Sequence, residues 1–325
     1  MADVFAYLKG FGASSGSPNK STIIVTAPTG STVTCKMGST TKTATEKNGA
    51  WTFGGLDLGT WTITSAKGGD SATQDVVITR LTVEYVTIVY RITPEFTYTG
   101  DYEIVDDSDN PISDFANWKN NWKIRFLTSG TFTVTKLNGW NGQLDVFLVG
   151  GGGNGETVRG ARGGGGGYTK TVKGVSIAIA TPYTITIGAS SGTSSAFGAS
   201  ANGASGVNGG SGGGGGGSSS GTSGDGGSNG GNGTAGNVSQ GGTGQGTTTR
   251  EFGESTGKLY SGGGGGSAAK AGAAGDSTAG AGAAFGGAAK NGVANTGGGG
   301  GAAYSGTAGR GGSGIVIARN ARGAA

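Results

Sequence analysis

The chain has 325 residues, of which 77 are glycine, five are proline, one is cysteine and none is histidine, and its formal net charge is +4. A single cysteine cannot form a disulfide framework or a thiol-rich metal site. Without histidine there is no Ser-His or Cys-His nucleophile pair and no imidazole metal ligand. The composition therefore favours a binding or structural protein over an enzyme, and we expect no catalytic residue, no cofactor and no metal site.

The first 20 residues are a candidate docking segment toward other proteins, although a frayed terminus has the same character. An apolar patch precedes the turn-forming sequence SSGSPNK and consists of Val4, Phe5, Tyr7 and Leu8. The segment lacks the long apolar run of a secretory signal, and no stretch of the chain approaches the ~20 apolar residues that span a bilayer. We expect synthesis in the cytoplasm and no membrane insertion.

Residues 21–92 show the two-residue period of half-buried strands. In STVTCKM, one face carries Val33, Cys35 and Met37, which makes Cys35 a core residue rather than a reactive thiol. Further short alternating runs are Trp51/Phe53, Trp61/Ile63 and Leu81/Val83/Tyr85. With glycine-bearing turns between them, they predict a small antiparallel β-sandwich.

This region also carries a family resemblance, in TEKNGAWTFGGLDLGTWTIT at residues 45–64. The run resembles the core motif of carboxypeptidase-regulatory-like, prealbumin-type β-sandwiches. The matching positions are Thr45, Gly49, Trp51, Phe53, Leu56, Gly59, Trp61 and Ile63. The resemblance implies a spacer or binding module with no chemistry of its own.

A second β region occupies residues 93–188 and returns at 312–320. The alternation of Trp122, Ile124 and Phe126 predicts one of its strands. Near the end of the chain, GSGIVIARN forms an apolar run that needs a partner. We expect it to lie beside strands near 144–149 and 183–187, which closes a second β-sandwich around an inserted segment, residues 189–311.

The inserted segment has a composition that predicts either disorder or an unusual solid. Residues 1–150 hold 16 glycines and the rest of the chain holds 61, and glycine-rich tracts bury too little side chain to offset their ordering entropy. Order would require dense backbone hydrogen bonding between closely packed extended chains. Runs of four to six glycines suit the threefold helix of polyglycine II, which we favour over disorder.

The C-terminal half carries a broader resemblance through an ordered set of motifs. These are DVFLVGGGG at 145–153, GGGGGY at 163–168, YTITIGA at 183–189 and GGSGIVIAR at 311–319. In this order they resemble the glycine-rich domains common in bacteriophage and prophage tail proteins. The architecture is also similar to the polyglycine tip adhesins of T-even-like phage long tail fibres, although those lack the front β-sandwich. The resemblance implies a tail location in the virion and attachment to a host surface.

We therefore expect an adhesin that binds a host receptor, glycan or surface protein, without covalent chemistry. The candidate contacts are the aromatic residues in the turns of the insertion, namely Phe197, Phe252, Tyr260, Phe285 and Tyr304. We expect a homo-oligomer, with a trimer favoured, and multivalency on the virion would add avidity. Basic residues are scattered singly, so no nucleic-acid partner is expected.

Two alternatives from other classes stay open. A self-assembling glycine-rich fibre protein would use the AGAAG-type segments for pairing between chains. A tail-associated polysaccharide depolymerase would need two carboxylates across a groove, and no local signature places them. The acidic run Asp106, Asp107 and Asp109 could bind Ca²⁺. It lacks the glycine and distal glutamate of an EF-hand, so we favour a solvated turn.

Overall fold

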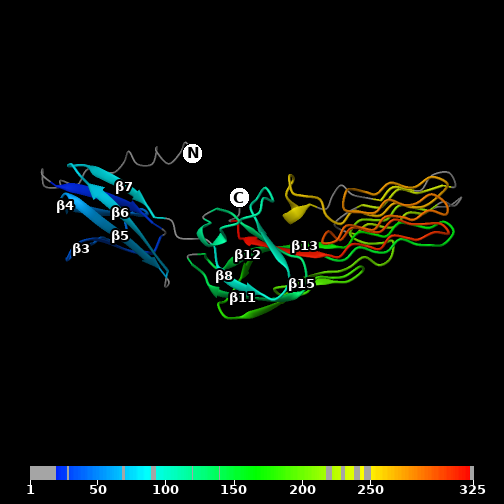
Figure 1. Ribbon diagram of the computed structural model, residues 1–325, viewed down its shortest axis with the longest axis horizontal. Coiled ribbons are helices and arrows are strands. Elements are labelled where there is room, and N and C mark those ends of the chain that lie inside the picture. Colours follow the sequence, from blue (N-terminus) through cyan, green and yellow to red (C-terminus); the bar gives the residue numbers. More distant parts are fainter. Residues whose placement is uncertain are drawn as a thin grey trace. The chain divides into compact units, whose positions relative to one another are not determined.

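The computed structural model describes residues 20–322, except 28, 68–69, 89–92, 119, 139, 217–221, 228–230, 238–241 and 245–249. These residues contain strands, turns and two 3-10 helices but no α-helix, so the predicted all-β class is confirmed (Figure 1). The chain divides into two compact units, one of Met1–Thr93 with Asn138–Trp140 and one of Pro94–Leu137 with Asn141–Ala325. The expected docking segment, apart from Lys20, lies outside the described residues.

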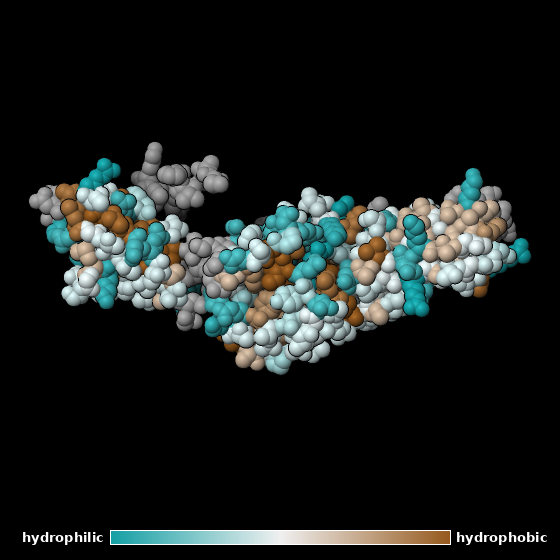
Figure 2. Space-filling view, viewed as in Figure 1, coloured by the Kyte–Doolittle hydropathy of each residue, from teal (hydrophilic) through white to brown (hydrophobic). Residues whose placement is uncertain are grey.

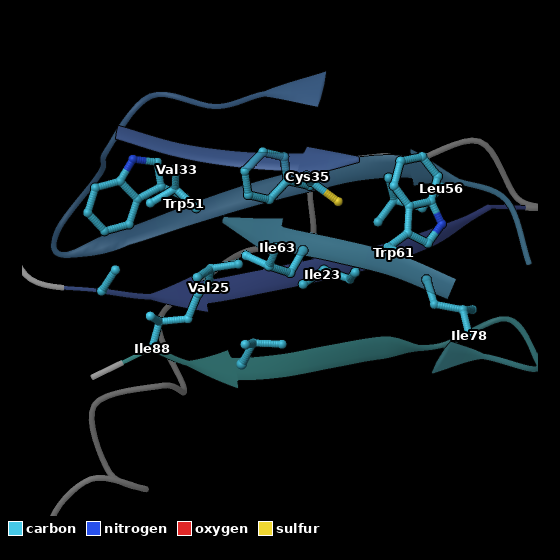
Figure 3. Close-up of a cluster of buried hydrophobic side chains, with 13 residues drawn as sticks. Ile23, Val25, Val33, Cys35, Trp51, Leu56, Trp61, Ile63, Ile78 and Ile88 are labelled. Atoms are coloured by element: carbon cyan, nitrogen blue, oxygen red, sulfur yellow. The ribbon is translucent and has the colours of Figure 1, made fainter. Parts of the chain in front are cut away.

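The first unit packs a three-stranded sheet, in the order β4-β1-β7, against a four-stranded sheet, in the order β3-β2-β5-β6. Its strands are β1 (Ser21–Thr26), β2 (Thr32–Met37), β3 (Thr40–Thr43), β4 (Ala50–Leu56), β5 (Gly59–Lys67), β6 (Asp70–Ile78) and β7 (Val83–Thr87). Figure 3 shows the apolar side chains that meet between the two sheets, with Trp51 and Trp61 the largest. Alternate residues of each strand therefore build one core.

Cys35 lies fully buried in this core, as the alternation predicts. Burial raises the pKa of its thiol to about 11. Because the thiolate is the reactive form, a raised pKa keeps the group inert at neutral pH. Cys35 is therefore a packing residue.

Strand β7 differs from the predicted antiparallel sandwich in two ways. It runs parallel to β1, with Thr22 opposite Val83, because the chain crosses over from β6 in the other sheet. Its predicted inward face is also wrong: Val83 and Tyr85 are 49% and 61% exposed, whereas Val86 is buried. A one-residue shift of the inward set exchanges the two faces of a strand.

The second unit contains two further sheets and a hairpin. The strands are β8 (Glu95–Tyr98), β9 (Tyr102–Val105), β10 (Lys123–Phe126), β11 (Gly130–Lys136), β12 (Gln143–Val149), β13 (Thr169–Ser176), β14 (Pro182–Ile185), β15 (Ser194–Ala196), β16 (Ala199–Ala201) and β17 (Ile315–Asn320), with 3-10 helices η2 (Phe115–Asn117) and η3 (Glu251–Gly253). The sheet orders are β13-β12-β17-β10-β9, β14-β11-β8 and β15-β16. Trp122, Ile124 and Phe126 are fully buried, as predicted.

Strand β17 returns to the centre of the five-stranded sheet, antiparallel to both β12 and β10. Val149 lies opposite Ile315 and Leu144 opposite Asn320, which confirms the predicted pairing with residues 144–149. The predicted pairing with residues 183–187 is wrong, because β14 pairs with β11 in the other sheet. The apolar run of β17 thus joins the end of the glycine-rich segment to the core.

Most of the glycine-rich segment forms an ordered bundle of extended threads that run side by side away from the sheets (Figure 1). We call this bundle the glycine array; it comprises the described residues of 150–168 and 202–314 outside the loop 250–260. Gly164 and Gly167, three residues apart, donate their N–H groups to the carbonyls of Gly300 and Gly297 at 2.8 Å each. The same spacing recurs for Gly163 and Gly166 toward Gly214 and Ser211, and for Gly165 and Tyr168 toward Gly206 and Asn202.

Successive amides of one thread thus point to three different neighbours and return to the first after three residues. A β-strand has a period of two, whereas polyglycine II has three residues per turn and no bonds within its own chain. The array is therefore a polyglycine II bundle, as the composition and runs predicted, and it includes residues 150–168, which precede the segment 189–311.

Where the threads of the array pack closest, there is no room for a side chain. A Cβ added to Gly164 would lie 2.0 Å from the carbonyl oxygen of Gly153, and one added to Gly166 would lie 1.8 Å from that of Ser261. These approaches place Cα–H groups against carbonyls of neighbouring threads, the geometry of weak Cα–H···O bonds. Only glycine permits this spacing.

Candidate functional site

In the part of the array that the structure describes, the far end contains four chain reversals that bond to one another. We call residues 156–162, 267–272, 283–287 and 303–307 the distal turns. The thread that continues from β12 runs away from the sheet to the first of these turns. Here Glu156 accepts a backbone hydrogen bond from Ala303 (3.0 Å), and Ala161 accepts one from Ser267 (3.0 Å). These bonds bring segments far apart in the sequence to one end of the bundle.

Ser267 links three of the distal turns. Its buried hydroxyl donates to the carbonyl of Ala283 at 2.6 Å and accepts from the backbone N–H of Tyr304 at 2.9 Å. Gly286 in turn donates to the carbonyl of Tyr304 at 3.0 Å. The turns are thus fixed by backbone and hydroxyl bonds, while the side chains of Thr157, Val158, Arg159, Lys270 and Phe285 are exposed.

An aromatic pair stands on two of these turns. The rings of Phe285 and Tyr304 have centroids 4.8 Å apart and planes inclined at 54°. Phe285 is 49% exposed, and Val158 on a third turn is 59% exposed. Exposed apolar and aromatic groups on rigid backbone are common at recognition surfaces.

The charges of the distal turns are unequal. Glu156 is the acidic residue of these turns, and its carboxylate is held by Arg162 through three side-chain hydrogen bonds of 2.7 to 3.2 Å. The hydrogen bonds to Glu156 raise the pKa of Arg162. Arg159 and Lys270 are exposed and have no ion-pair partner among the described residues. The distal turns therefore carry a net positive charge.

The five predicted contact residues separate into two groups. Phe285 and Tyr304 lie together on the distal turns. Phe252 and Tyr260 are 5% and 1% exposed and pack on Phe147 of β12. Neither ring is available at the surface, because the loop 250–260 folds back onto the core beside β17. The expectation that Phe252 and Tyr260 contact a receptor from turns of the insertion is therefore corrected: both are core residues.

Phe197 also lies away from the distal turns. It is half-buried, and its ring packs against Phe132 and Tyr183 at centroid distances of 5.9 and 5.4 Å. It sits between β15 and β16 with φ of +50°, where it closes the hairpin on the sheet. The aromatic residues of the insertion thus serve mainly to attach the array to the sandwich.

The loop 250–260 brings charged groups into contact with the sheet. Lys123 bonds both Asp109 (2.6 Å) and Glu251 (3.0 Å), and Arg319 bonds Glu254 (2.7 Å). Burial by itself lowers the pKa of Lys123, but the hydrogen bonds and charges of its two carboxylate partners outweigh it, so the pKa is raised. Burial and the charge of Glu251 raise the pKa of the Tyr260 hydroxyl.

A cavity of about 630 Å³ opens beside these ion pairs. Its rim includes the Asp106–Asn110 turn, where Asp106 accepts backbone hydrogen bonds from Ser108 and Asn110 at 2.8 Å each. Asp107 pairs with Arg322 and Asp109 with Lys123. The carboxylates are held by the protein's own donors, and the described residues contain no group of three or more potential metal ligands. The arrangement favours a structural turn, so the distal turns remain the stronger candidate site.

Comparison with protein families matches residues 127–321 to the glycine-rich domain, which covers more than half of the chain. The chain therefore belongs to the glycine-rich domain family. Among solved structures, it is similar to a DUF3823 family protein from Bacteroides ovatus ATCC 8483, at 12% identity over 51% of this chain and 79% of that one, with a TM-score of 0.20. No curated protein matches the chain. In the part of the chain that the structure describes, no helix is both long and apolar enough to cross a bilayer.

Sequence reasoning missed Val158, Arg159 and Lys270. The signal was present: Val158 and Arg159 lie in the short stretch between the glycine runs 150–153 and 163–167, and Lys270 lies soon after the run 262–266. Large side chains cannot enter a bundle of such close threads. Any bulky or charged residue between two runs must therefore lie in a turn or on the outside. Because candidate contacts were chosen only among aromatic residues, these three residues were not predicted.

Proposed function

We propose that this protein is an adhesin of a bacteriophage tail, which binds a host cell surface through the distal turns of its glycine array. Binding is non-covalent and uses the exposed side chains of the turns together with backbone groups. The first β-sandwich serves as a spacer, and the virion supplies several copies. No catalytic step is part of the proposal.

The observation that carries the proposal is the construction of the distal turns. Among the described residues, four chain segments that are far apart in sequence meet at one end of a bundle whose interior consists mainly of glycine and small residues. A platform of this kind holds its surface groups in place before binding, so less ordering entropy opposes association. The phage assignment itself is supported by the order of motifs in the C-terminal half.

The direct test is binding of the full chain to cells from a panel of candidate bacterial hosts, measured by flow cytometry with labelled protein. A variant with Phe285→Ala and Tyr304→Ala removes the aromatic pair but keeps the backbone bonds of both residues. We expect its binding to weaken by about tenfold or more, as is usual for buried aromatic anchors. The matched control is Tyr85→Ala, an aromatic residue of the first unit that is 61% exposed.

Unchanged binding in the aromatic variant would remove the distal turns from the proposal. Loss of binding in the Tyr85 control alone would move the contact surface to the first unit. Absence of binding to every host, together with long homopolymers in electron micrographs of the purified protein, would favour the self-assembling fibre instead.

A further inference from the structure

We infer that the partner of the glycine array is a polyanionic surface polysaccharide, rich in phosphate, sulfate or carboxylate groups. The inference rests on the proposed function and adds the chemical class of the ligand. It is based on the charged side chains of the array, an observation separate from the aromatic pair on the distal turns.

The acidic side chains between residues 150 and 314 are engaged within the protein. Glu156 is bound by Arg162, and Asp276 accepts hydrogen bonds from the backbone N–H and hydroxyl of Thr278 at 2.8 and 2.5 Å. The remaining three also have partners: Asp225 with Asn232, Glu251 with Lys123, and Glu254 with Arg319. Glu156, Glu251 and Glu254 are thus paired with cations, whereas Asp225 and Asp276 keep their charge and are bonded by neutral donors.

Apart from Arg162, which binds Glu156, the basic side chains of the array show the opposite behaviour. Arg159, Lys270, Lys290 and Arg310 are all exposed, and none has an ion-pair partner among the described residues. Figure 2 shows hydrophilic side chains standing apart on a largely pale surface in this region. A low-charge surface with isolated cations creates a positive potential that attracts polyanions.

Backbone hydrogen bonds connect the segments that carry the cations in two pairs. The turn that carries Lys270 bonds the turn that carries Arg159 through Ser267 and Ala161. Along the threads, Gly292 donates to the carbonyl of Arg310 at 2.8 Å, which brings the segments of Lys290 and Arg310 together. Two exposed cations thus lie on bonded distal turns, and two more lie on bonded threads of the same array.

The spacing of the charges favours a polysaccharide over a nucleic acid. Nucleic-acid surfaces usually combine clustered Lys and Arg with aromatic rings free to stack on bases. Here the cations are single, and the Phe285 and Tyr304 rings pack against each other. Thr157, Ser305 and Thr307 are exposed on the same turns, and their hydroxyls can both donate and accept hydrogen bonds with sugar hydroxyls.

The experiment measures binding of the full chain to dextran sulfate, alginate, neutral dextran and single-stranded DNA by biolayer interferometry. We expect binding to dextran sulfate or alginate that weakens at least tenfold between 50 and 500 mM NaCl, because salt screens exposed charges. Arg159→Gln with Lys270→Gln should weaken it about fivefold or more at low salt. The control Lys36→Gln with Lys47→Gln removes two exposed cations of the first unit and should leave binding unchanged. The relative affinities for dextran sulfate and alginate distinguish sulfate-like from carboxylate ligands.

Equal binding of neutral dextran, or tighter binding of DNA than of either polyanionic sugar, would overturn the inference. Cell binding that neither excess dextran sulfate nor the double variant reduces would also overturn it while leaving the adhesin proposal in place. Binding to the polyanions without binding to any host cell would support the inference and count against the adhesin proposal.

Discussion

At the residue scale, glycine in this protein acts as a building unit rather than as a flexible joint. In the run 163–167 every residue is buried, and every amide donates to a carbonyl of another thread. Glycine loses more conformational entropy on folding than any other residue. Dense hydrogen bonding, at about 1 kcal/mol net per bond, and close Cα–H···O contacts offset that loss.

Replacing Gly164 with alanine tests this account. The new methyl group would lie 2.0 Å from the carbonyl oxygen of Gly153, so the threads must separate. We expect a loss of at least about 1–3 kcal/mol in the free energy of unfolding of the second unit, as for overpacked cores. Denaturant titration followed by circular dichroism measures it.

Gly287→Ala is the matched control within the same array. A Cβ there would lie 3.2 Å from its nearest neighbour, the carbonyl oxygen of Ala284, which a small shift accommodates. Its stability should stay within about 0.5 kcal/mol of the parent, the usual range for substitutions without a specific clash. Equal effects of the two alanines would show that close thread packing is not what stabilises the array.

At the scale of elements, the threads replace strands as the unit of packing. A strand bonds two neighbours in one plane, whereas a polyglycine II thread bonds neighbours on three sides. The run 163–167 contacts threads containing Gly214, Gly300 and Gly206 in this way. A bundle held on three sides can be rigid without a hydrophobic core.

Amide hydrogen exchange measures that rigidity. We expect the amides of residues 163–167 and 297–301 to exchange orders of magnitude more slowly than those of an unstructured glycine peptide, because each must break an interior bond. Mass spectrometry of peptides from the labelled full chain gives the rates. Exchange at the free-peptide rate would mean that the array is not a solid in solution, and the platform for recognition would be lost.

Some of these elements could be predicted from the sequence and others could not. Strand alternation identified β10 and the core faces of β2, β4 and β5, because burial on one face leaves a clear period. It misassigned the inner face of β7, since an edge strand with Val83 and Tyr85 outside looks the same as one with them inside. The partners of each thread could not be predicted, because glycine runs are identical to one another and only turn lengths select the pairing.

At the scale of the second unit, ion pairs attach the loop 250–260 to the sheet, the Lys123–Glu251 pair buried and the Arg319–Glu254 pair half-exposed. Arg319 of β17 reaches both Asp145 on the neighbouring strand and Glu254 in the loop. The hydrogen bond from Arg319 is the main cause that lowers the pKa of Glu254, with a smaller opposing effect of burial. The attachment of the loop to the sheet therefore depends on the ionised state of its carboxylates.

A pH dependence follows from the direction of this shift. A carboxyl with a lowered pKa in the folded state stabilises the fold above its unfolded pKa, and that stabilisation is lost as the pH falls through the folded pKa. We expect the midpoint temperature of the second unit's thermal transition to decrease once the pH is lowered below about 4.5, the ordinary range for Glu. In Glu254→Gln the transition should be lower at neutral pH by the equivalent of about 0.2–1 kcal/mol, as for exposed ion pairs, and its fall on acidification should be smaller.

Calorimetry resolves the comparison if the first unit serves as an internal reference. Asp75→Asn, an exposed carboxylate of the first unit that bonds only Thr62 in the described structure, is a suitable control. An acid-induced fall that is identical in parent and Glu254→Gln would assign the pH dependence to other carboxylates.

The central place of β17 has a consequence for synthesis. While a ribosome makes the stretch between β12 and β17, the edge of β12 that later bonds β17 is unpaired. This edge could pair with the wrong segment or with another chain. The intervening stretch offers few competitors, because glycine, serine and alanine form weak strands. Its plain composition thus protects an unfinished sheet during translation, a benefit separate from anything the completed protein binds.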